Sequence, residues 1–108
     1  MLSLPTPLAA YMQAVNARNT AAALRCFTPQ AHVHDDGHHY HGQAEIGAWL
    51  TRTQQATPFT QEATHVEAAA AETVVTLRVT GRFPCSPLTL QADFRLADDL
   101  IRDLRLHG

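Results

Sequence analysis

The chain has 108 residues, of which 45% are hydrophobic and 17% are charged, and these values are typical of a single globular domain over residues 1–108. The formal net charge of -2 provides no basic face for nucleic acid, and all eight basic residues are arginine, so no lysine is available for a Schiff base or a phosphate-binding loop. No apolar run approaches the roughly 20 residues that span a bilayer, and the N-terminus lacks the basic segment of a signal peptide, so we expect a cytoplasmic protein without membrane segments.

Three helices are predicted in the first half of the chain. Thr6 is suited to cap a helix whose first position is Pro7, where the missing backbone N–H does no harm. Apolar residues at helical spacing then continue to about Arg18. A second, alanine-rich helix ends before Pro29, and a third carries an apolar face that includes Trp49. The expected helices cover residues 6–18, 21–27 and 43–55.

Between the second and third helices, the stretch 31–42, AHVHDDGHHYHG, concentrates titratable groups. Five of the seven histidines lie here, namely His32, His34, His38, His39 and His41. They accompany two adjacent carboxylates, Asp35 and Asp36. The dipeptide Asp36-Gly37 is a strong signal for a tight hairpin turn. We therefore predict two short strands joined at this turn, and we expect any chemistry of the protein to involve this stretch.

From Phe59 onward the pattern changes from helical to alternating, which is typical of an antiparallel sheet with one buried and one exposed face. Strands are predicted over residues 59–69, 73–83, 87–97 and 100–107. The predicted class is α+β, with three helices packed on one face of a curved, mainly antiparallel sheet. Such a sheet leaves a conical pocket beneath the helices. The side chains expected to line this pocket are Trp49, Val75, Leu77, Val79, Ala92 and Phe94.

Several short motifs give the chain a family resemblance. They are Ala23-Leu24, Phe27, Ala31, Val33 and Asp35, followed by Gly42, Ile46 and Trp49. With the order of the predicted elements, these residues resemble the nuclear transport factor 2-like superfamily, which includes ketosteroid isomerases and SnoaL-like polyketide cyclases. The resemblance implies a cone-shaped fold that encloses a pocket. The superfamily contains enzymes, ligand binders and transport adaptors, so the fold alone does not specify an activity.

The resemblance also implies a catalytic arrangement. Ketosteroid isomerase uses an aspartate base on the first strand, which matches Asp35, and a tyrosine donor on the first helix, which matches Tyr11. Removing such a carboxylate from water favours its neutral form, so the group becomes a usable base. The family's second oxyanion donor is an aspartic acid, and Ala92 occupies its position here. We therefore expect weaker oxyanion stabilisation or a substitute donor, either His39 at the pocket rim or a bound water.

Three readings of the function remain open. The first is cofactor-free proton transfer next to the carbonyl of a small apolar compound, of the isomerase, cyclase or lyase type. It follows from the absence of a phosphate-binding loop, of any lysine and of a cysteine–histidine pair placed by the sequence. The second is a non-catalytic pocket for a small apolar ligand. The third is a metal site on the histidines, since pairs two residues apart on adjacent strands can converge on one ion.

The first two histidines are expected on the outer face of the sheet. His32 and His34 alternate with Val33 and Asp35, so they point away from the pocket if Asp35 points into it. In the family, this outer face often packs against a second subunit, which implies a homodimer. The charged and imidazole side chains expected on this face are His32, His34, Arg78, Asp93 and Arg95.

Overall fold

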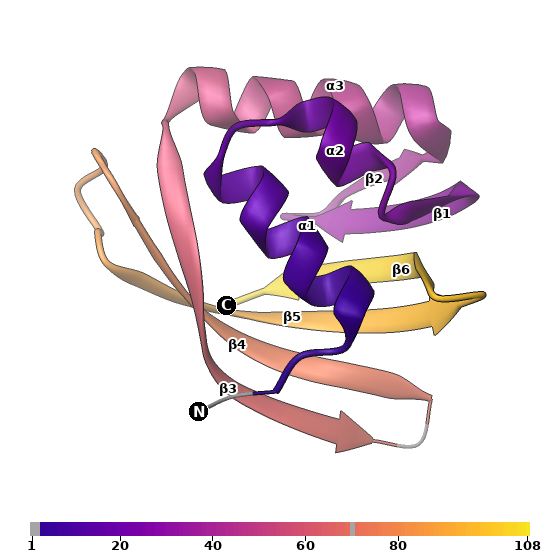
Figure 1. The fold of residues 1–108 in the computed structure, drawn as a ribbon. Coiled ribbons are helices and arrows are strands. Elements are labelled where there is room, and N and C mark those ends of the chain that lie inside the picture. The colour runs from indigo at the N-terminus through magenta and orange to yellow at the C-terminus, as the bar shows by residue number, and fades with distance from the viewer. Residues whose placement is uncertain (1–2, 70) are drawn as a thin grey trace.

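The computed structural model describes residues 3–69 and 71–108, which form three helices and six strands (Figure 1). In chain order the elements are α1 (Thr6–Asn16), α2 (Thr20–Leu24), β1 (Phe27–Asp35), β2 (His38–His41), α3 (Gly42–Ala56), β3 (Phe59–Ala69), β4 (Glu72–Gly81), β5 (Leu88–Ala97) and β6 (Leu100–His107). The predicted α+β architecture is confirmed: a hairpin separates the second and third helices, and a four-strand meander follows.

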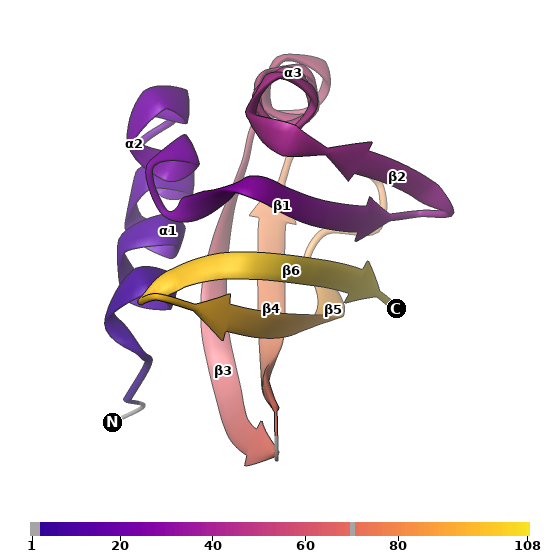
Figure 2. The same ribbon diagram turned by 90° about the vertical axis from the view of Figure 1, so that its right-hand side faces the viewer.

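The six strands form one open sheet in the order β2-β1-β6-β5-β4-β3. Every neighbouring pair is antiparallel except β1 and β6, which run parallel. Figure 2 shows that the sheet bends strongly, so that β3 and β4 run across the direction of β1 and β6. The last strand of the chain therefore returns beside the first one, and the backbone N–H of Ile101 donates to the carbonyl of Cys26 at 2.7 Å.

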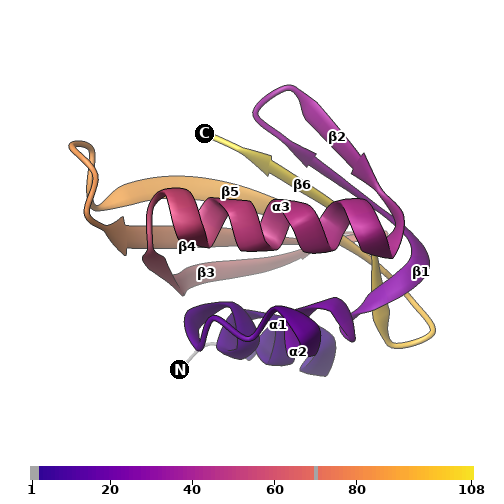
Figure 3. The ribbon, with the colours of Figure 1, turned by 90° about the horizontal axis from the view of Figure 1, so that it is seen from above.

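The three helices cover one face of this sheet, as Figures 1 and 3 show. Helix α1 contacts β3 and β6, whereas α3 contacts β1 and β2. The core between the layers is apolar, with Leu8 and Ile46 fully buried on the helices and Phe94 and Leu104 buried on the strands. Burial of these side chains, each stabilising by roughly 2 kcal/mol, holds the helices on the sheet.

The second helix is shorter than the sequence predicts. It ends at Leu24, and Phe27 already belongs to β1, where it pairs with Ile101 of β6. The side chain of Phe27 is 3% exposed and contacts the ring of Tyr11. The tertiary contacts of Phe27 therefore override its helical spacing, and Pro29 prevents the helix from continuing.

Candidate functional site

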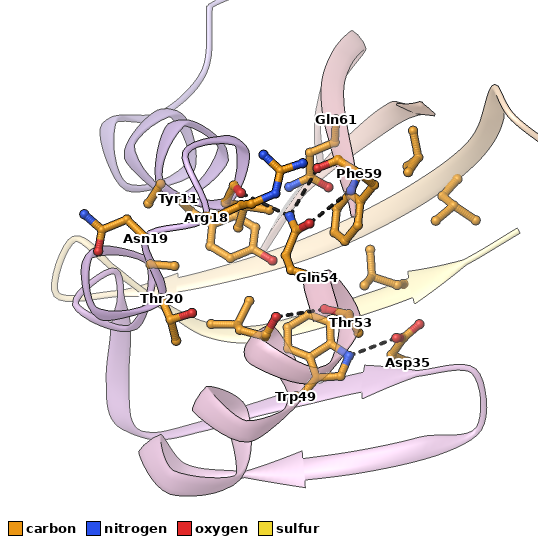
Figure 4. A pocket seen from close by; sticks show the side chains of 17 residues that line it. Tyr11, Arg18, Asn19, Thr20, Asp35, Trp49, Thr53, Gln54, Phe59 and Gln61 are labelled. Atoms are coloured by element: carbon orange, nitrogen blue, oxygen red, sulfur yellow. Dashed lines mark hydrogen bonds between the residues drawn. The ribbon is translucent and has the colours of Figure 1, made fainter. Parts of the chain in front are cut away.

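A cavity of about 170 Å³ lies between the helices and the sheet. Its walls come from α1, the turn into α2, the end of β1, α3 and the meander strands. Most of its surface is apolar, and Figure 4 shows the polar side chains that interrupt it. An apolar cavity with a few inward-facing polar groups is the usual form of a small-molecule site.

Asp35 is the last residue of β1, directly before the hairpin turn, and its side chain lines the cavity. Val33, two residues earlier on the same face, is fully buried. The indole Nε1 of Trp49 donates a 3.0 Å hydrogen bond to Asp35 Oδ2 (Figure 4). Because Trp49 is itself buried on α3, this bond holds the carboxylate in one orientation at the cavity wall.

Tyr11 reaches the same cavity from α1, and its side chain is 4% exposed. Its ring meets Phe27 and Phe94 edge-on, with ring centroids 5.4 and 6.0 Å apart. Burial first, then the nearby negative charge of Asp35 and the thiol of Cys26, raise the pKa of Tyr11 far above its ordinary value. The phenol therefore keeps its proton at physiological pH and remains a hydrogen-bond donor.

The carboxamide of Gln54 fixes one side of the cavity. Its Nε2 donates to the carbonyls of Val15 at 3.1 Å and Phe59 at 3.2 Å, and its Oε1 accepts from the backbone N–H of Phe59 at 3.0 Å. These bonds tie α3 to the end of α1 and to the first residue of β3. Both N–H donors of this amide and one acceptor site of its oxygen are therefore used by the backbone, so Gln54 has a structural role.

Gln61 on β3 differs from Gln54, and the sequence analysis did not identify it. Its backbone is held by Asn16, whose Oδ1 accepts from Gln61 N at 2.8 Å and whose Nδ2 donates to Gln61 O at 2.9 Å. Its side chain is 9% exposed and lines the cavity, yet its Nε2 has no hydrogen-bond partner within the described parts of the chain. The available signal was its inward position on the strand, between Phe59 and Ala63.

The side chains expected to line the pocket divide into two groups. Trp49 and Val79 line the cavity. The other four lie outside its lining and are buried in the core: Val75, Leu77, Ala92 and Phe94. The ring of Tyr11 packs against Phe94 and fills the space above that part of the sheet. The open volume is therefore displaced toward Phe59 and Val79, at the other end of the meander.

His39 was expected at the pocket rim, but the structure places it on the opposite face of the sheet. It pairs with His34 across the β1–β2 hairpin, and the two rings stack with centroids 4.3 Å apart. Side chains of a cross-strand pair share a face, so His39 points outward with His34. Tyr40, one residue later, takes the inner face and stacks on Trp49.

The outer histidines contact each other and an acidic neighbour. His32 Nε2 and His39 Nδ1 are joined by a 2.9 Å hydrogen bond, and His32 Nδ1 lies 4.0 Å from a carboxylate oxygen of Asp103. Within residues 3–69 and 71–108, no group of three or more histidine, cysteine or acidic side chains is arranged to hold a metal ion. Among the same residues, no helix is long and apolar enough to cross a membrane.

Solved structures with the same fold include proteins that carry enzyme-like descriptions. A candidate polyketide cyclase from Sinorhizobium meliloti is 30% identical, with a TM-score of 0.92 over 96% of this chain and 95% of that chain. A protein with a ketosteroid isomerase-like fold from Catenulispora acidiphila, crystallised with trimethylamine, is 17% identical, with a TM-score of 0.86 over 98% and 87% of the two chains. A nuclear transport factor 2-like protein from Cytophaga hutchinsonii is 10% identical, with a TM-score of 0.80 over 99% and 90%.

The sequence itself identifies the family. No curated protein matches the chain. The model of the SnoaL-like domain matches residues 8–103, which include β1 to β5, the first half of β6 and every residue of the cavity lining except Leu106. With the 30% identity to the Sinorhizobium meliloti protein over nearly the whole chain, this match confirms the resemblance drawn from the motifs around Asp35. The chain belongs to the SnoaL-like domain family, and it has the fold of nuclear transport factor 2-like proteins.

Proposed function

We propose that the cavity binds a small apolar carbonyl compound and that Asp35 moves a proton next to the carbonyl without a cofactor. One observation carries the proposal: Asp35 and Tyr11 line the same apolar cavity, close enough for the carboxylate charge to raise the pKa of the phenol. A fixed base and a neutral donor are the two groups that enolisation needs. The candidate polyketide cyclase and the ketosteroid isomerase-like fold among the neighbours support this reaction class.

In the proposed step, the carboxylate of Asp35 takes a proton from the carbon beside the carbonyl, and the electrons of that C–H bond move toward the carbonyl oxygen. The O–H of Tyr11 donates a hydrogen bond to the enolate oxygen that develops. The proton on Asp35 then returns to carbon, at the same or at a conjugated position, so the atoms balance without a second reactant. The indole of Trp49 keeps the carboxylate oriented between the two transfers.

The absence of the family's second oxyanion donor leads us to expect a slow reaction. Ala92 occupies its position, and it is fully buried in the core. Loss of one oxyanion donor typically lowers the rate on the order of a hundredfold. We therefore expect turnover well below that of an enzyme with two donors, unless another group in the cavity supplies the second hydrogen bond.

Exchange of carbon-bound protons tests this proposal before a natural substrate is known. Small cyclic ketones are incubated in D2O with the protein, and loss of their α-proton signals is followed by NMR. We expect exchange with the wild type and none with Asp35→Asn, because the amide cannot accept the proton. Asp36→Asn is the matched control, since Asp36 is exposed in the adjacent turn and is not part of the cavity lining. Equal exchange rates for Asp35→Asn and the parent would refute the assignment.

A non-catalytic binding pocket is the second candidate, and the fully buried Ala92 at the donor position favours it. A binder would retain ketones in the cavity and change the fluorescence of Trp49, the single tryptophan of the chain, without accelerating α-proton exchange. Fluorescence titration and exchange, measured on the same ketones, therefore separate the two candidates.

We also propose that the protein is a homodimer through the outer face of the sheet. The support is the mixed charge of this face, where Arg95 lies 3.7 Å from Glu72 and His107 lies 3.0 Å from Asp93. Alternating charges of this kind are compatible with a two-fold partner that presents the same surface.

A further inference from the structure

The two ends of the cavity differ chemically. Figure 4 shows Trp49 and Asp35 at one end, Arg18 and Gln61 at the other, and Tyr11 between them. Asp35 is the single acidic residue of the described lining, and Arg18 is its single basic one. The proposed proton transfer uses Asp35 and Tyr11, so it assigns no role to Arg18 or Gln61.

Gln61 presents a buried donor without an acceptor. Its Nε2 is the single buried side-chain polar atom without a hydrogen-bond partner within the described residues, and Gln61 as a whole is 9% exposed. The neighbouring amides of Asn16 and Gln54 hydrogen-bond to backbone groups, and neither accepts a hydrogen bond from Gln61 Nε2. A buried donor left unpaired is destabilising. The side chain that carries this donor lines the cavity and its backbone is held by Asn16, an arrangement suited to binding a ligand oxygen.

Arg18 holds a backbone conformation that normally belongs to glycine. Its φ is 57°, and the bonds from Arg18 N to Val15 O and from Asn19 N to Ala14 O form the cap that ends α1. Glycine is the usual residue at this position because it adopts a left-handed conformation without strain. An arginine here is therefore less favourable for folding. Arg18 is exposed, and it lines the cavity with no carboxylate within 4.0 Å of it in the described residues.

We infer that the Arg18–Gln61 end of the cavity binds a carboxylate, so that the ligand is an apolar carbonyl compound that also carries an acid group. The guanidinium supplies the positive charge, and Gln61 Nε2 supplies a second, uncharged hydrogen bond to the same group. The acid end of the ligand then lies away from Asp35, and its carbonyl lies beside Tyr11. This inference rests on the proposed function, because it takes the cavity to be the ligand site.

The inferred carboxylate site is tested with two probes of similar shape, of which one is an anion and the other is neutral. Phenylacetate and phenylacetamide are both titrated into the protein while the fluorescence of Trp49 is recorded. We expect phenylacetate to bind at least about tenfold more tightly than phenylacetamide, as a charge-assisted contact to arginine requires. Arg18→Gln should remove this preference, whereas Arg18→Lys, which keeps the positive charge, should retain most of it. Gln61→Leu should weaken both probes, because both offer an oxygen to Nε2.

The control variant is Arg25→Gln, because Arg25 is exposed beside α2 and is outside the cavity lining. It should leave the preference unchanged. Arg18→Gln keeps a side chain of similar length in the same left-handed conformation, so its stability should match the parent. Equal affinities of the two probes, no binding of either, or an unchanged preference in Arg18→Gln would each overturn the inference. Failure of Asp35 in the exchange assay would leave these binding results intact, so the two proposals fail separately.

Discussion

At the scale of single residues, Gln61 should lower the stability of the ligand-free protein. Its Nε2 is buried without a partner in the described chain, and such a group destabilises by roughly 1 kcal/mol or more. We expect Gln61→Leu, which removes the donor and keeps the volume, to raise the free energy of unfolding by about 1 kcal/mol. Urea unfolding followed by far-UV circular dichroism measures this change.

Gln54→Leu provides the matched comparison for Gln61→Leu. The amide of Gln54 makes three hydrogen bonds to backbone groups of Val15 and Phe59, and the substitution leaves those groups unpaired. We expect a loss of about 2 kcal/mol. If both variants lose stability equally, Gln61 Nε2 is satisfied in solution, and its assignment as a ligand donor loses its basis.

The raised pKa of Tyr11 predicts a loss of stability at alkaline pH. In the unfolded chain a tyrosine loses its proton above about pH 10, whereas folded Tyr11 retains it because of burial and the charge of Asp35. The folded state then binds more protons than the unfolded state, so the free energy of unfolding decreases as pH rises, by up to about 1.4 kcal/mol per pH unit. Below about pH 10 this contribution is constant.

Urea unfolding at about pH 9 and about pH 11 tests this sign, because the two values lie on either side of the tyrosine titration. We expect the decrease in stability between the two pH values to be smaller in Tyr11→Phe than in the wild type. Identical decreases in the two proteins would show that Tyr11 ionises equally in both states and is not buried beside Asp35 as described.

How far the sequence predicts the site depends on the kind of residue. Asp35 and Tyr11 were identified by motif, and Trp49 by its helical face, because local patterns report which way a side chain points. Gln61 was missed, since nothing local shows that Asn16, which is distant in sequence, fixes its backbone and leaves its amide free. His39 was misplaced, because the face it takes depends on cross-strand pairing with His34.

At the scale of elements, the two tight hairpins differ in their turn residues. The first uses Asp36-Gly37, and the turn between β5 and β6 uses Asp98-Asp99, with φ values of 53° and 60°. Both residues of this type of turn adopt the left-handed region, where glycine is favoured at the second position. We expect Asp99→Gly to raise the free energy of unfolding by roughly 0.5 kcal/mol, since relief of strain exceeds the added flexibility of glycine in the unfolded chain.

Comparison with Asp99→Ala tests whether the stability gain expected for Asp99→Gly comes from relief of backbone strain. Alanine cannot hydrogen-bond locally as aspartate does and is strained at positive φ, so this variant should be less stable than the parent. Thermal unfolding of the three proteins should therefore rank glycine above aspartate above alanine. A glycine variant less stable than the parent would contradict the turn geometry.

The sequence predicted the element boundaries that local signals determine. It did not predict the boundaries that tertiary packing determines. The hairpin turn at Gly37 was predicted from residue type, and the third helix from its apolar face. The early start of β1 was not, because Phe27 is extended only through its pairing with Ile101 of the last strand. The parallel pairing of β1 and β6 likewise joins the two ends of the chain and has no local signature.

At the scale of the whole molecule, the outer face of the sheet is where the proposed dimer would form and where pH should act. Partial burial first, then the neighbouring His39, Arg105 and His32, lower the pKa of His34, and Asp35 opposes this effect. A histidine with a lowered pKa in the folded state binds protons less readily than in the unfolded chain. The contribution of neutral His34 to the free energy of unfolding is therefore fully present above about pH 6.5 and decreases as pH falls below that value.

We expect a dimer in sedimentation equilibrium at micromolar protein and about pH 7.5, and a shift toward the monomer of 11.8 kDa at about pH 5.5. Protonation adds positive charge to His34, whose ring stacks on His39, and Arg105 lies on the same face. Two such faces would then repel each other across the two-fold axis. His34→Asn should reduce the pH dependence, whereas His65→Asn on β3, outside this cluster, should not. A monomer at both pH values would refute the dimer, and a dimer equally stable at both would refute the role of His34.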